Sequence, residues 1–173
     1  MYTSTLNLDG HEFKGTMDIY SLKKIQEDLL NEGEQTSITN IFIKISEFNM
    51  LYISSFVLNT LARIDKSQSN KFLEIYLKDT DDLEALNRFN SIFTYINDVM
   101  MKCLPKTKSK EESIFEDDYY DDKDWEFDYM EYIWNSIIGR NDNFWNITPK
   151  NYFEQLNIYK KFNNIKDEEV EVF

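Results

Sequence analysis

The chain of 173 residues is long enough for one ordinary domain with a small appendage, and 42% of its residues are hydrophobic. Its formal net charge of −13 argues against nucleic acid as a partner, because phosphate contacts require clustered lysine and arginine side chains. No apolar run approaches the ~18 residues of a bilayer span and the N-terminus lacks signal-peptide regions, so we expect a cytoplasmic protein without membrane contact.

The first fifteen residues have the pattern of a β-hairpin. Polar residues alternate with Leu6 and Leu8, and Phe13 follows a central Asp9-Gly10 pair. Asp-Gly favours a two-residue type I′ turn, because both residues tolerate positive φ angles. The sequence therefore predicts two antiparallel strands joined at this pair.

Helical spacing follows the hairpin as far as residue 64. Asp18 or Ser21 can cap a first helix that ends near Gly33. From Ser37 the spacing of the isoleucines predicts a second helix, although their alternation also permits a strand. Residues 48–64 are apolar almost all round, which predicts a helix in the centre of the core.

The next part of the chain ends in the strongest helical pattern. Residues 66–70 are polar and predict a loop, and residues 71–78 fit either a short strand or a helical turn. Asp81 and Glu84 then form a capping box for a helix that Pro105 ends. The apolar residues of this helix recur at three- and four-residue steps: Leu83, Leu86, Phe89, Ile92, Phe93, Ile96 and Met100.

More than half of the net charge lies in fifteen residues. In residues 114–128 eight acidic residues and one lysine give −7, whereas in residues 1–105 fifteen acidic and ten basic residues give −5. Like charges close in sequence extend a chain. We therefore expect a hairpin and helical-bundle domain at 1–105, an acidic linker at 106–124, and a C-terminal helical arm at 125–173.

The arm has the pattern of two short helices separated by a loop. Residues 125–138 place apolar side chains on one face, and Gly139 can end that helix. Thr148 and Pro149 supply an N-cap and a first-turn proline for the second helix. The sequence therefore predicts a mainly α fold, in which a hairpin and helical bundle precede an acidic linker and a short helical extension.

No catalytic, cofactor or metal site is predicted. One histidine, His11, and one cysteine, Cys103, are too few for the usual zinc ligand sets. A dyad of these two residues has no supporting motif, and the apolar neighbours of Cys103 indicate a buried thiol. The acidic run pairs its carboxylates and contains no glycine, unlike an EF-hand loop. We therefore expect a protein that is not an enzyme.

Aromatic residues in the linker and the arm are the candidate partner-binding residues. Acidic residues mixed with aromatic ones suit a segment that docks onto a basic protein, since charge steers the encounter and rings anchor it. A solvated linker and a small internal core of the arm are the competing interpretations. The candidates are Tyr119, Tyr120, Trp125, Trp134, Phe144 and Trp145.

The layout resembles that of phage tail assembly chaperones. The resemblance rests on the hairpin LNLDGHEFKG, the apolar helices, the charged linker and the segment Phe144-Trp145-Asn146-Ile147-Thr148-Pro149. It implies that the N-terminal domain self-associates or coats the tape-measure protein and keeps it soluble. It also implies that the extension recruits the tail tube protein through Phe144, Trp145, Thr148 and Pro149, in the bacterial host cell and without enzymatic activity.

A second interpretation belongs to another class of protein. The acidic residues 117–128 could mimic phosphate and block the cationic cleft of a basic toxin or nuclease, as a small immunity or inhibitor protein does. Gene neighbourhood distinguishes the two hypotheses. A chaperone gene lies between the tail tube and tape-measure genes, whereas an immunity gene follows a toxin gene.

Overall fold

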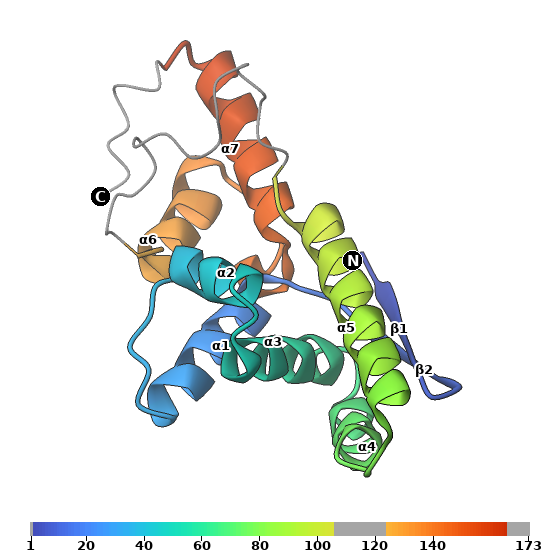
Figure 1. The fold of residues 1–173 in the computed structure, drawn as a ribbon. Helices are drawn as coiled ribbons and strands as arrows, with labels where there is room; N and C mark the ends of the chain where they lie inside the picture. Colours follow the sequence, from blue (N-terminus) through green and yellow to red (C-terminus); the bar gives the residue numbers. More distant parts are fainter. Residues whose placement is uncertain (1, 106–123, 166–173) are drawn as a thin grey trace, which may run out of the picture.

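The computed structural model describes residues 2–105 and 124–165, and it is mainly helical (Figure 1). Its regular elements are β1 (Ser4–Leu8), β2 (His11–Gly15), α1 (Ile19–Asn31), α2 (Ile38–Ser46), α3 (Met50–Ala62), α4 (Lys66–Tyr76), α5 (Asp82–Cys103), α6 (Phe127–Tyr132) and α7 (Pro149–Phe162). A π-helical turn extends α6, and a 3₁₀ turn precedes α7. The predicted mainly α fold with an N-terminal hairpin is confirmed.

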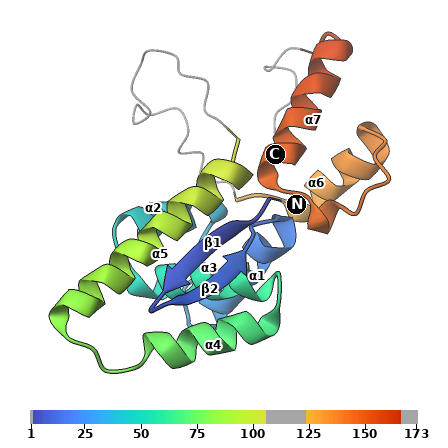
Figure 2. The same ribbon diagram turned by 90° about the vertical axis from the view of Figure 1, so that its right-hand side faces the viewer.

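The hairpin forms at the predicted turn. β1 and β2 are antiparallel, with Leu6 opposite Phe13. Asp9 and Gly10 have φ angles of 48° and 76°, as a type I′ turn requires. Figure 2 shows α5 running beside β1 and α4 beside β2, so these helices flank the hairpin.

The hairpin, α3 and α5 meet at Gly15. A Cβ atom at this position would lie 1.8 Å from Oη of Tyr95, so the close approach requires glycine. The Tyr95 hydroxyl bonds to Oγ1 of Thr60 at 2.8 Å, and the N–H of Thr16 donates to the Thr60 carbonyl at 3.0 Å. These contacts join the hairpin to α3, which lies in the core as its apolar sequence predicts.

Side-chain caps begin the helices close to the predicted positions. Asp18 caps α1 by accepting from the N–H of Ser21, whose hydroxyl accepts from the N–H of Asp18, so both predicted residues take part. Asp81 caps α5 by accepting from the N–H of Glu84 at 2.8 Å. The Glu84 side chain accepts from Thr80 instead, so half of the predicted capping box is present.

The prediction of a loop at residues 66–70 is wrong, because these residues form the first turns of α4. Asp65 caps the helix by accepting from the N–H of Ser67 at 2.9 Å. The remaining polar side chains of this segment are mostly exposed, and only three of the eleven residues of α4 are buried: Ser69, Phe72 and Ile75. Of the two structures allowed for residues 71–78, the helix is the one that forms.

The predicted helix at residues 125–138 is interrupted. α6 ends at Tyr132 and continues as a π-helical turn, in which the N–H of Ile138 donates to the carbonyl of Ile133 at 2.8 Å. Ile133 and Trp134, at the start of this wider turn, are both buried. Gly139, with a φ angle of 74°, follows the helix as predicted.

Within residues 2–105 and 124–165, no single helix has the length and apolar character needed to cross a membrane. α2 and α3 satisfy those requirements only when taken together, and a bend of 116° separates them. Many of their apolar residues are buried in the core, including Ile41, Ile45, Ile53 and Val57.

Candidate protein-binding surfaces

The C-terminal arm is docked onto the N-terminal domain. The N–H of Ile19 donates to the carbonyl of Ile147 at 2.9 Å, and Nη2 of Arg63 donates to Oδ1 of Asn146 at 2.7 Å. Arg63 also pairs with the buried carboxylate of Asp18 at 2.6 Å. Contacts therefore cross the predicted domain boundary. In Figure 1 the lower end of α7 lies beside α5, and its upper end projects from the molecule.

The last residue of the predicted linker, Asp124, is fixed against the domain. Its Oδ1 accepts from the N–H of Ile38 at 2.8 Å, at the start of α2, and its other oxygen accepts from the amide of Gln26 on α1. A carboxylate at a helix N-terminus satisfies a free backbone donor and interacts favourably with the helix dipole. Asp124 therefore joins α1, α2 and the arm.

Trp134 and Phe144 are buried, which corrects the expectation that the arm presents them to a partner. Each is 1% exposed. Their rings lie 6.2 and 5.9 Å from that of Tyr152, and Nε1 of Trp134 donates to the carbonyl of Asp142 at 3.0 Å. In this structure both side chains form the interior of the arm, as the competing interpretation allowed.

Thr148 and Pro149 are buried as well. Oγ1 of Thr148 accepts from the N–H of Asn151 at 3.2 Å, so Thr148 is the N-cap of α7. Pro149 occupies the first helical turn, where its missing N–H costs nothing. The predicted helix start is confirmed, but the surface position implied by a recruiting role is not found for these two residues.

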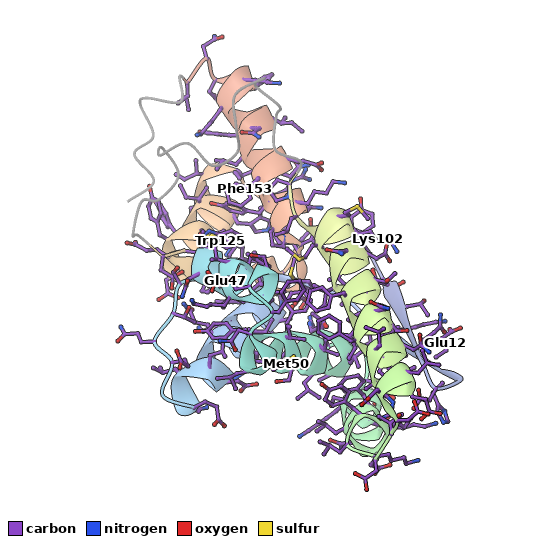
Figure 3. The ribbon with its side chains drawn as sticks, in the orientation of Figure 1. Glu12, Glu47, Met50, Lys102, Trp125 and Phe153 are labelled. Carbon is purple, nitrogen blue, oxygen red and sulfur yellow. The ribbon has the colours of Figure 1, made fainter. Side chains whose placement is uncertain are left out.

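Trp125 and Trp145 are the two predicted binding residues that stay partly accessible. The Trp125 ring lies 5.5 Å from that of Phe153, and both are labelled in Figure 3. Trp145 packs 6.0 Å from Phe127, and Nζ of Lys23 lies 4.7 Å from its ring centroid. These two tryptophans are therefore the arm's remaining candidates. The other two predicted residues, Tyr119 and Tyr120, lie outside the described part of the chain.

Sequence reasoning missed an aromatic cluster where the connection between α2 and α3 meets α5. The Phe48 ring, in that connection, lies 5.0 Å from the Phe93 ring and 5.9 Å from the Phe89 ring. The rings of Phe89 and Phe93 are 4.6 Å apart. Phe48 is nevertheless 58% exposed, so the cluster lies at the surface. Figure 3 labels Glu47 and Met50, which lie on either side of Phe48 in the sequence.

Phe48 has a backbone conformation that is unusual for its residue type. Its φ angle is 61°, in the left-handed region. The N–H of Asn49 donates to the carbonyl of Lys44, and that of Phe48 to Ile45, so α2 ends in a Schellman motif. Phe48 occupies the position that glycine usually takes in this motif. A bulky residue there costs about 1–2 kcal/mol of backbone strain.

α5 has a second apolar face beside its buried one, and of the residues on it Phe93 packs partly against the core. One side of the helix carries Asp82 and, four, seven and eleven residues later, Leu86, Phe89 and Phe93. Leu86 is 55% exposed. We call Phe48, Leu86, Phe89 and Phe93 the corner patch. The buried face of α5 is formed by other residues: Arg88, Ile92, Tyr95, Ile96, Val99 and Cys103.

Four acidic residues, which we call the acidic rim, lie at the N-terminal end of α5: Asp79, Asp81, Asp82 and Glu84. In residues 78–84, at the start of α5, four acidic residues and one lysine give a charge of −3. The nearest arginine on α5, Arg88, lies on the buried face and pairs with Asp9 at 2.6 Å. The corner patch therefore has a negative N-terminal end, with Asp82 in line with its apolar residues.

A groove of about 410 Å³ lies between α1, α3 and α4 and is a weaker candidate site. Two of its charged side chains are already paired within the chain, Lys24 with Glu27 and Arg63 with Asp18, and the Asp28 carboxylate accepts from the Asn59 amide at 2.8 Å. The guanidinium of Arg63 also lies 5.3 Å from the ring centroid of Tyr20. These contacts are satisfied without a ligand, in contrast to the exposed Phe48 ring of the corner patch.

The candidate dyad residues do not acquire catalytic surroundings. Cys103 is buried, and desolvation raises the pKa of its thiol, which disfavours the thiolate needed for nucleophilic attack. His11 is exposed at the start of β2. Among the described residues, no cluster of three or more His, Cys, Asp or Glu side chains could hold a metal ion.

The corner patch thus combines an exposed ring and a strained backbone at Phe48, two half-buried rings at Phe89 and Phe93, and an acidic rim. These are properties of a protein-binding surface, because aromatic residues contribute most to binding energy and charge selects the partner. No family model, curated protein or solved structure matches this chain. The geometry of its own surfaces therefore carries the functional argument.

Proposed function

We propose that this protein is a non-enzymatic assembly chaperone that covers an apolar helical segment of another protein with its corner patch. In the form implied by the resemblance to tail assembly chaperones, the client is the tape-measure protein of a phage tail. The arm then recruits the tail tube protein, through Trp125 and Trp145. This assembly takes place in the cytoplasm of the bacterial host cell.

The observation that carries this proposal is the position of Phe48. Its ring is more than half exposed although its backbone is in a conformation that phenylalanine rarely adopts. Folding alone gains little from such a residue, since asparagine or glycine would end α2 without the strain. A large exposed ring at a strained position is typical of a recognition site.

The charge of the chain supports the same function. A chaperone of an apolar helix must bind through an apolar surface and still keep the complex in solution. The net charge of −13 opposes non-specific association of the complexes, while the corner patch supplies the apolar contact. The two requirements are met by different parts of one small protein.

The proposal is tested by co-expression with a phage tape-measure protein, the client that it names. We expect the client to stay in the soluble fraction with the wild-type chain and to precipitate with the Phe48→Asn variant, which removes the ring but suits a positive φ angle. Phe162→Asn is the matched control, because Phe162 is also exposed but lies at the far end of α7. It should protect the client as the wild type does.

Equal protection by the wild type and by Phe48→Asn would contradict a role for the corner patch. Affinity capture from the native host provides a second criterion. Recovery of a nuclease or toxin without tail proteins would contradict the chaperone function and favour the immunity interpretation.

A further inference from the structure

The composition of the corner patch identifies the class of partner that fits it. Leu86, Phe89 and Phe93 recur at three- and four-residue steps along one side of α5, and Phe48 lies over the last two. From Leu86 to Phe93 they span about 10 Å along the helix axis, at 1.5 Å per residue. A partner helix that places apolar residues at the same steps can pack along this face.

The acidic rim adds a charge preference. Asp79 and Asp82 are exposed, and Asp82 extends the line of apolar residues by one turn. At the other end of α5, Lys102 is paired with Asp98 at 2.6 Å, so its charge is compensated within the helix. Among the described residues of α5, the acidic side chains without a paired cation therefore lie at its N-terminal end.

A second copy of the chain fits this surface less well than a basic partner does. Each copy carries a net charge of −13, so two copies repel each other before their apolar faces meet. A partner with basic residues is attracted to the same surface and neutralises part of the charge.

We infer that the occupant of the corner patch is an amphipathic helix of another protein, with lysine or arginine residues at the end that meets Asp79 and Asp82. This inference rests on the proposed chaperone function and specifies its client. The basic end lies at the N-terminus of α5, and the apolar stripe packs against Phe48, Phe89 and Phe93. The orientation of the client helix is therefore set by charge, and its affinity by the aromatic rings.

Three synthetic peptides of about 20 residues, long enough to form a helix on binding, provide the test. They share one apolar stripe and carry lysine, glutamine or glutamate residues at one end. Their dissociation constants for the full chain are measured by fluorescence anisotropy. At low salt we expect the lysine peptide to bind about tenfold more tightly than the glutamine peptide, since a few exposed ion pairs contribute this much. The glutamate peptide should bind most weakly, and about 0.5 M salt should remove most of the difference.

Variants of the acidic rim test whether its residues cause the tighter binding of the lysine peptide. Asp79→Asn combined with Asp82→Asn should remove most of the advantage of the lysine peptide. The matched control is Glu32→Gln combined with Glu154→Gln, which changes the net charge equally at exposed positions at the end of α1 and on α7. This control should keep the advantage. Circular dichroism checks that both double variants are folded.

The outcomes separate this inference from the proposed function. Equal binding of the three peptides, lost in Phe48→Asn, would overturn the charge preference and leave the chaperone function standing. Binding that Phe48→Asn does not weaken would overturn both. A dimer of the free chain that Phe48→Asn dissociates would show that the occupant is a second copy, and would overturn the inference.

Discussion

In the arm the aromatic rings are buried against one another, whereas the corner patch holds the exposed ring of Phe48 against two half-buried rings. Trp134 and Phe144 enclose Tyr152 and are almost completely buried. Phe48 also contacts two rings, at distances that are no longer, but more than half of its side chain is exposed. The number of ring contacts is therefore a poor guide to whether an aromatic cluster stabilises the fold or is available to a partner.

The difference follows from the lengths of the helices involved. α6 has six residues and α7 fourteen, and helices this short need packing from the surrounding chain to be stable. Their large rings are therefore needed inside the arm. α5 has twenty-two residues and is already packed against the hairpin. The face that carries the corner patch is less buried, since Leu86 is exposed and Phe89 and Phe93 are half-buried.

The largest effect is expected for Trp134→Ala. The side chain is 1% exposed, and removing it leaves a cavity among Tyr152 and its neighbours. We expect the free energy of unfolding to fall by about 3–5 kcal/mol, as for other buried aromatic residues. Chemical denaturation followed by circular dichroism measures this loss. A loss below about 1 kcal/mol, typical of an exposed position, would remove the contrast between the arm and the corner patch.

Trp145→Ala tests a half-buried residue, intermediate between the buried Trp134 and the exposed Phe48. The ring is partly buried against Phe127 and Phe144 and contacts the Lys23 ammonium. We expect the free energy of unfolding to fall by about 1–3 kcal/mol, because part of this packing is lost. If Trp145 recruits a partner, binding of the tail tube protein should weaken as well. Unchanged binding with the same loss of stability would make Trp145 a structural residue like Trp134.

Much of the fold was predictable because its signals are local. The Asp9-Gly10 turn depends on two adjacent residues, and the helix starts at Asp18, Asp81 and Thr148 depend on side chains within three residues of the cap. The start of α4 was missed, although Asp65 provides a similar local cap, because polar residues fill the solvent face of its first turns. Local signals do not show which face of a helix another segment covers.

The candidate sites depended on contacts between distant residues, which is why they were predicted less well. Burial of Trp134 and Phe144 follows from the arm's own tertiary packing and from its attachment to α1. The positive φ angle of Phe48 follows from the way α2 ends and cannot be inferred from a phenylalanine in the sequence. One available signal was the apolar arc of α5, which is wider than a single packed face requires.

The smallest effect on stability is expected for Phe48→Asn, and this makes the variant informative. Asparagine relieves about 1–2 kcal/mol of strain at a positive φ angle, while loss of the two ring contacts with Phe89 and Phe93 costs about 1–3 kcal/mol in all. The two terms oppose each other, so the free energy of unfolding should fall by less than about 2 kcal/mol. Chemical denaturation measures the sum, and Phe48→Gly provides a second replacement suited to the same backbone. A loss as large as that of Trp134→Ala would show that Phe48 is a core residue, and the corner patch would then belong to the fold in the same way as the arm.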